Sequence, residues 1–115
     1  MKTQRMQRID HEIQRVLGTL ISRELKDPRL GFTTVTHVEV TPDLRNARVY
    51  VSIIGDRHAA RQTMDALAHA ARFLRGELGH QIALRYVPEL TFVEDRTTER
   101  AIAVSKALRD AQGGP

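Results

Sequence analysis

Apolar residues in the first part of the chain recur at steps of three and four, the spacing that gathers side chains on one face of an α-helix. This pattern predicts a helix from about residue 4 to 26, whose apolar face consists of Met6, Ile9, Ile13, Val16, Leu17, Leu20 and Ile21. Pro28 disfavours helical backbone at Asp27, and Gly31 supplies a turn residue. The helix is therefore expected to end near Asp27.

Two segments rich in β-branched residues follow. Residues 32–40 (FTTVTHVEV) are expected to place Phe32, Val38 and Val40 on one side of a strand, with His37 and Glu39 on the other. Residues 48–54 (RVYVSII) alternate in the same way. The residues expected to face inward are Val49, Val51 and Ile53, and those expected to face outward are Arg48, Tyr50 and Ser52. The short polar segment TPDLRN between the strands predicts an antiparallel hairpin.

The second half of the chain returns to helical spacing. After Gly55, with Asp56 as the expected N-cap, the apolar positions are Ala60, Met64, Leu67, Ala71, Leu74, Leu78 and Ile82. The segment ELTFVED at 89–95 predicts a third strand, and Pro88 suits its start because proline has no N–H to donate. A last helix is expected from about Thr97, through Ala101, Val104 and Leu108, until the sequence QGGP ends it.

These elements predict one α+β domain over the 115 residues. The hairpin makes the first two strands antiparallel, whereas strands joined by a helical crossover are normally parallel. We therefore expect a three-stranded mixed sheet with helices packed on one face. The expected domain covers residues 1–115, with flexible ends at about 1–3 and 110–115.

Arginine is concentrated in the middle of the chain. The net charge is +4, and Arg outnumbers Lys fifteen to three. Residues 44–86 carry seven Arg against Asp56, Asp65 and Glu77, so this segment holds the whole surplus. Guanidinium groups bind phosphate with planar, two-pronged geometry, which favours a polyanionic partner. The alternative is that these residues are a solvated face. With five aromatic residues in all, phosphate contacts are expected to dominate over base stacking.

The sequence offers little for catalysis. Without cysteine, disulfides and thiolate chemistry are excluded. His11, His37, His58, His69 and His80 form no close metal-binding pair, and neither a GxSxG nor a phosphate-binding GxxxxGK[ST] motif occurs. No apolar run approaches the roughly 20 residues of a membrane helix, and no apolar stretch follows the basic N-terminus as in a secretion signal. We expect a cytoplasmic protein without cofactor or metal.

The segments VTPDLRNARVYVS and VPELTFVED, at this spacing and with this element order, closely resemble bacterial ribosome-binding factor A. The resemblance runs from about residue 3 to 109. It implies a KH-like domain of the second type, in the order α-β-β-α-(kink)-α-β-α. It also implies a non-catalytic assembly factor that binds the small (30S) ribosomal subunit and its rRNA. Such factors act in late maturation and rRNA 5′-end processing, matter most in the cold, are monomers when free, and work beside other assembly factors that include a GTPase.

The resemblance places a helix kink, Ala-x-Gly in the family, at Ala70, Ala71 and Arg72, where arginine replaces the expected glycine. Glycine would permit unusual backbone angles at little cost, so we expect only a shallow bend or an offset between two helices. A literal GxxG of KH domains occurs at 76–79, but Glu77 would repel phosphate and Leu78 shares the core spacing. We interpret it as the weak end of a helix.

The predicted RNA-binding residues are arginines of the middle segment: Arg45, Arg48, Arg61, Arg72, Arg75 and Arg85. Three arginines of the first helix, Arg5, Arg8 and Arg15, share a polar face and are candidates for additional contacts. Two other functions stay open. One is a protein-interaction module that recruits another factor through the sheet edge, and the other is a small acid/base enzyme that uses His37 or Glu39.

Overall fold

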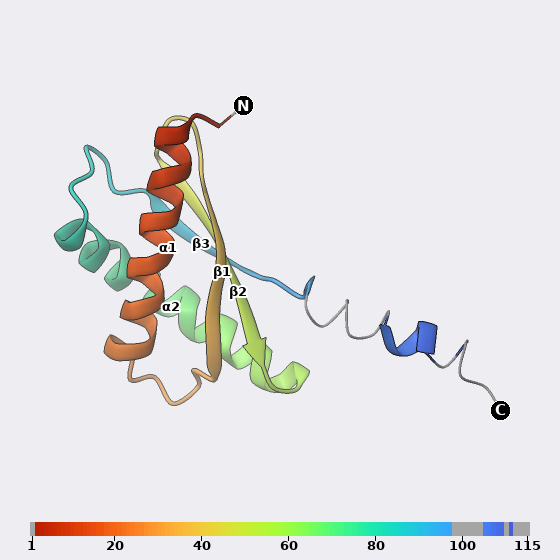
Figure 1. The fold of residues 1–115 in the computed structure, drawn as a ribbon. Coiled ribbons are helices and arrows are strands. Elements are labelled where there is room, and N and C mark those ends of the chain that lie inside the picture. The colour runs from red at the N-terminus through yellow and green to blue at the C-terminus, as the bar shows by residue number, and fades with distance from the viewer. Residues whose placement is uncertain (1, 98–104, 110, 112–115) are drawn as a thin grey trace.

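The computed structural model describes residues 2–97, 105–109 and 111. The elements in chain order are α1 (Gln4–Glu24), β1 (Phe32–Val40), β2 (Asn46–Ile54), α2 (Arg57–Gln81) and β3 (Glu89–Glu94) (Figure 1). This order confirms the prediction as far as β3. Most of the predicted last helix, including Ala101 and Val104, lies outside the described residues, although residues 105–109 are helical and exposed. None of the described helices is both long and apolar enough to cross a membrane.

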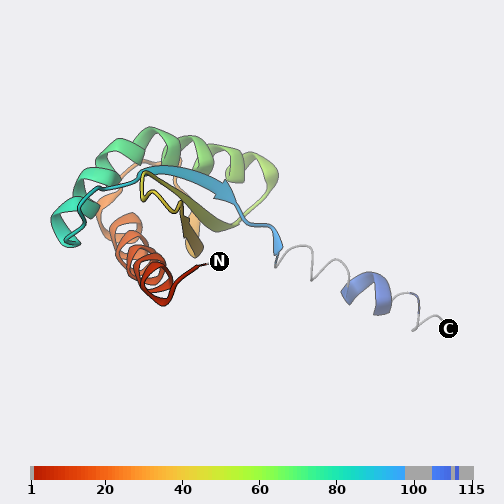
Figure 2. The same cartoon turned by 90° about the horizontal axis from the view of Figure 1, so that it is seen from above.

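The three strands form a mixed sheet, as predicted. Their order is β1-β2-β3, with β1 antiparallel to β2 and β2 parallel to β3. Helix α1 packs mainly against β1 and α2 against β3, so both helices cover the same face of the sheet. Figure 2 shows α2 arching across the β3 side of this layer. The other face, called the open face below, carries no described helix.

The core lies between this helix layer and the sheet. Its buried members are spread over all five elements, which confirms the helical spacing of α1 and α2 and the inward positions predicted for Val49 and Val51 in β2. The core residues are Ile13, Val16, Leu17, Leu20, Ile21, Val35, Val38, Val40, Ala47, Val49, Val51, Leu67, Leu74, Leu78, Ile82 and Leu90.

The prediction that Phe32 lies on the same side of β1 as Val38 and Val40 is wrong. Val35 pairs with Val51 and His37 with Tyr50, so Thr36 is an extra residue in β1, a β-bulge. One inserted residue reverses the alternation of side chains before it. Phe32 therefore lies on the open face beside its partner Ile54, and the two side chains are 75% and 73% exposed.

A buried carboxylate fixes the start of α1 to the sheet. Asp10, only 5% exposed, accepts a hydrogen bond of 3.1 Å from the backbone N–H of Val40 and forms an ion pair with Lys2. Thr3 caps the helix by accepting a hydrogen bond from the N–H of Met6. These contacts orient α1 along the end of β1.

Helix α2 is continuous over its 25 residues, from an N-cap at Asp56 whose side chain accepts from the N–H of Ala59. Of the two alternatives expected at Ala70, Ala71 and Arg72, an offset between two helices is not found, because all three residues are helical. The shallow bend agrees with the curved course of α2 in Figure 2. Without glycine there, the backbone curves around the core and keeps its hydrogen bonds.

An ion pair joins the start of α2 to the end of β3. The Arg57 guanidinium donates two hydrogen bonds, of 2.8 and 2.7 Å, to the carboxylate of Glu94. These bonds hold the pKa of Glu94 below its usual 4.5, and partial burial opposes them. A depressed pKa stabilises the fold above the unfolded value, and this contribution is lost as the pH falls through the lower folded value.

We therefore expect Glu94→Gln to lower the melting temperature at pH 7, with a smaller difference from the wild type at pH 3. Thermal unfolding of both proteins at the two pH values measures this. Glu12→Gln, on the exposed side of α1, is the control and should have little effect at either pH. A loss for Glu94→Gln of equal size at both pH values would show that the ion pair does not contribute.

Candidate nucleic-acid interface

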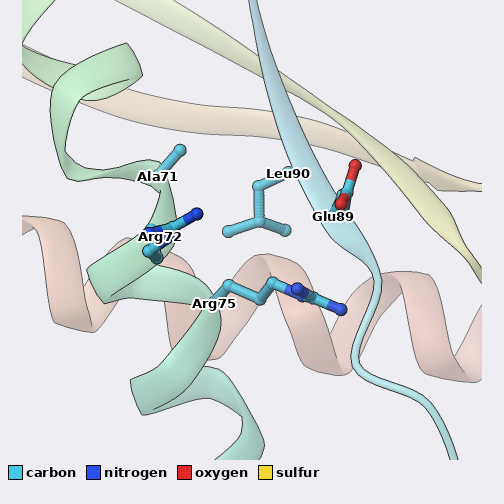
Figure 3. A pocket seen from close by; sticks show the side chains of 5 residues that line it. All are labelled: Ala71, Arg72, Arg75, Glu89 and Leu90. Carbon is cyan, nitrogen blue, oxygen red and sulfur yellow. The ribbon is translucent and has the colours of Figure 1, made fainter.

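A pocket of about 190 Å³ lies where the middle of α2 meets the start of β3. Its lining residues are Ala71, Arg72, Arg75, Glu89 and Leu90 (Figure 3). Arg72 and Arg75 are three residues apart, so they project from neighbouring positions on one side of the helix. Figure 3 shows Leu90 pointing toward α2 as the floor and Arg75 reaching toward the chain before β3. Two of the three predicted kink residues thus line a concave surface.

A second pocket, of about 320 Å³, adjoins the first because the two share Arg75 and Glu89. The other residues around it are Arg45, Asn46, Tyr86 and Val87. The side chain of Arg85 joins this group, since its Cζ lies 5.9 Å from the Tyr86 ring centroid, and the Cζ of Arg45 lies 5.8 Å from the same point. We call Arg45, Arg72, Arg75, Arg85, Tyr86 and Glu89 the basic site.

Arg45 lies in the hairpin turn between β1 and β2, which places it at this site. The backbone carbonyl of Arg45 accepts a hydrogen bond of 2.9 Å from the N–H of Glu89, which ties the turn to the start of β3. Leu44 takes the left-handed conformation, with φ of 61°, to make the turn. The Asp43 carboxylate accepts from the Thr41 hydroxyl and the N–H of Arg45, and these bonds lower its pKa. The Asp43 carboxylate therefore has its hydrogen-bond partners within the turn.

Arg75 has a structural contact that the sequence did not reveal. Its Nε and Nη2 atoms donate hydrogen bonds of 3.1 and 2.9 Å to the backbone carbonyl of Val87. The same segment comes close to α2 at Gly79, where an added Cβ would lie 2.9 Å from a methyl carbon of Val87. Arg75 and Gly79 together hold residues 82–88 against the helix, so Arg75 positions Tyr86 and Val87 as well as contributing charge.

We expect Arg75→Lys to loosen this segment although the charge is kept. An ammonium group cannot reproduce the two-pronged bond to one carbonyl, so a loss of about 1 kcal/mol in the free energy of unfolding is expected. Hydrogen exchange at residues 83–87 should become faster. Arg72→Lys is the matched control, because no hydrogen bond of Arg72 is found in the described part of the chain. Equal exchange rates in the two variants would contradict the positioning role.

The structure brings together only part of the predicted set. Arg45, Arg72, Arg75 and Arg85 converge. Arg48 lies on the open face opposite Glu39, and Arg61 lies eleven positions before Arg72 on α2, about 16 Å along the helix axis. The arginines of α1 that were candidates for additional contacts are exposed but line neither pocket: Arg5, Arg8 and Arg15.

Sequence reasoning missed Tyr86, Asn46 and Glu89. The small number of aromatic residues argued against stacking, and that count ignored where each ring lies. The adjacent letters Arg85 and Tyr86, next to the specific VPELTF segment, were the available signal. Glu89 is the one acidic side chain lining either pocket among the described residues, so positive charge prevails.

The literal GxxG at 76–79 lies inside α2, which continues to Gln81. Leu78 is fully buried, as its spacing predicted, and Gly79 packs against Val87. An exposed phosphate-binding loop is absent from these four residues. The interpretation of this tetrapeptide as the end of a helix is confirmed.

His37 and Glu39 lie side by side on the open face. His37 Nε2 and Glu39 Oε1 are 3.3 Å apart, and the side chains are 54% and 45% exposed. Solvent surrounds both groups, so their setting gives no support to acid/base catalysis, which depends on desolvated and oriented groups. Within residues 2–97, 105–109 and 111, no three His, Asp or Glu side chains are grouped to hold a metal ion.

Comparison with known proteins gives a consistent family. The sequence profile of ribosome-binding factor A matches residues 5–108. The ribosome-binding factor A of Lachnoclostridium phytofermentans is 46% identical over 108 residues, which are 93% of this chain and 79% of that protein.

Solved structures agree. The solution NMR structure of a Thermotoga maritima protein, described as a putative ribosome binding factor A, has a TM-score of 0.73 at 33% identity. The match covers 84% of this chain and 92% of that one. A homology model of Thermus thermophilus ribosome binding factor A, fitted into the cryo-EM map of a 30S complex, has a TM-score of 0.64 at 31% identity, over 76% of this chain and 92% of that one.

Proposed function

The chain belongs to the ribosome-binding factor A family, and from this premise we propose that it binds the small (30S) ribosomal subunit through rRNA contacts at the basic site. The observation that carries the proposal is the convergence of Arg45, Arg72, Arg75 and Arg85 from three separate parts of the chain around two adjoining pockets. Guanidinium groups that converge on a concave surface can bind successive phosphates. The Thermus thermophilus relative, fitted into the map of a 30S complex, supports the choice of partner.

The proposal includes the finer role implied by the family. The protein acts as a non-catalytic, cytoplasmic assembly factor in late small-subunit maturation and rRNA 5′-end processing, with a role in cold adaptation. It is a monomer when free and works beside other assembly factors, a GTPase among them. Arg48 and Arg61, with the α1 arginines Arg5, Arg8 and Arg15, extend the contact surface beyond the basic site.

The second candidate is a protein-interaction module. Its supporting observation is the exposed apolar pair Phe32 and Ile54 at one end of the open face, because large apolar side chains on a surface favour protein contacts. Such binding would depend weakly on salt and would survive nuclease treatment.

Sedimentation of cell extract at low and high salt tests the proposal. We expect the protein to migrate with free small subunits and not with whole ribosomes, and to be released by nuclease or high salt, since phosphate contacts are lost as salt rises. Migration as a free protein under all conditions would overturn the proposal. Retention after nuclease treatment would favour the interaction module.

A further inference from the structure

We propose that Tyr86 is a stacking site for one unpaired nucleotide of RNA, so that the basic site recognises single-stranded RNA and not only the phosphates of a duplex. This inference rests on the proposed RNA-binding function and names the part of the RNA that is bound. Its basis is an exposed aromatic ring that lies within 6 Å of two guanidinium groups and borders a pocket of about 320 Å³.

The ring of Tyr86 is available to a ligand. Tyr86 is 52% exposed. It is one of five aromatic residues in the chain. Its backbone is nevertheless fixed, since the next residue, Val87, is held by two hydrogen bonds from Arg75. A rigid and exposed ring provides a flat apolar surface without a large entropy cost on binding.

Two arginine side chains lie beside the ring, at the far end of the cation–π range. Their Cζ atoms lie 5.8 and 5.9 Å from its centroid, close to the limit of about 6 Å for cation–π attraction. An incoming base can therefore replace a guanidinium over the ring. The displaced Arg45 or Arg85 then remains near enough to bind the phosphate of the same nucleotide.

The remaining lining residues suit a base edge. Asn46 offers both a donor and an acceptor, and the Glu89 carboxylate accepts from the N–H groups of a base while repelling phosphate. The site is thus polarised, with phosphate on the arginine side and the base edge toward Glu89. A duplex presents mainly phosphate and sugar, whereas unpaired bases are free to stack on aromatic side chains.

Tyrosine fluorescence gives a direct test. The chain has two tyrosines and no tryptophan, so Tyr50→Phe leaves Tyr86 as the only intrinsic fluorophore. We expect a short unstructured RNA oligonucleotide to quench this emission, and the same strand in a duplex to quench it much less. Tyr86→Phe is the matched control, because it leaves Tyr50, on the open face, as the reporter. Equal quenching of the two reporters, or no quenching of Tyr86, would overturn the inference.

Affinity measurements separate stacking from charge. Loss of one base–aromatic stack should make Tyr86→Ala bind the single strand roughly five- to 150-fold more weakly, with an unchanged salt slope because no phosphate contact is lost. Tyr86→Phe should bind like the wild type, and Arg45→Gln should reduce the slope by about one. Wild-type affinity in Tyr86→Ala would overturn the inference.

Sedimentation with small subunits keeps the two proposals distinct. If wild-type protein binds the subunits but Tyr86→Ala matches it in oligonucleotide affinity, the stacking inference fails and the proposed function stands. If wild-type protein does not bind the subunits, the proposed function fails, whatever the oligonucleotide titration gives.

Discussion

Replacement of both Arg45 and Arg72 by Glu is expected to weaken binding to small ribosomal subunits by at least about 100-fold, because two charge-assisted contacts worth roughly 1.5–3 kcal/mol each become repulsive. Both side chains are exposed and border the pockets of the basic site. Arg75 is left in place because its bonds to Val87 would confound a loss of charge with a loss of structure.

The salt dependence identifies the cause of this loss. Each phosphate contact removed should lower the slope of log affinity against log salt by about one, so the double variant should lose about two. Arg23→Glu with Lys26→Glu makes the same change in net charge at exposed positions at and beyond the end of α1. If this control weakens binding as strongly as the double variant does, net charge and not the basic site governs binding.

The second large effect concerns stability. Leu74→Ala should lower the free energy of unfolding by about 2–5 kcal/mol, because the side chain is fully buried and its removal leaves a cavity. For a domain of this size, the melting temperature should fall by at least roughly 8 °C. Leu74 lies between Arg72 and Arg75 in sequence but faces the core, so it anchors the part of α2 that carries both.

The neighbouring residue provides the control. Phe73 is 48% exposed, so Phe73→Ala removes a larger side chain from a position that contributes less to the core. We expect chemical denaturation to show a clear shift of midpoint for Leu74→Ala and a small one for Phe73→Ala. Equal shifts would mean that Leu74 does not pack between α2 and the sheet.

The helices and strands, and their order along the chain, follow from the residue pattern alone as far as β3. Helical and alternating spacings are local properties, and they sufficed for α1, α2 and the three strands. The hairpin and the helical crossover then required a mixed sheet, since each connection restricts how its two strands can pair. The motifs VTPDLRNARVYVS and VPELTFVED led to the family that the comparisons confirm.

One inserted residue in β1 made the predicted side of Phe32 wrong. The bulge at Thr36 depends on how β1 pairs with β2, so the letters of β1 alone do not encode it. The continuity of α2 at Ala70, Ala71 and Arg72 agrees with its unbroken helical spacing, whereas the expectation of a kink there came from the family resemblance.

The candidate site, in contrast, depends on how distant parts of the chain pack together. Arg45, Arg75 and Arg85 meet because a hairpin turn, a helix and the segment before β3 are joined there, through the bond from Glu89 N–H to the Arg45 carbonyl and the bonds from Arg75 to Val87. Arg48 and Arg61, which the sequence did not distinguish from these arginines, lie outside the basic site. Local spacing fixes the face of an element on which a side chain lies, but convergence between distant elements depends on the packing of the whole chain.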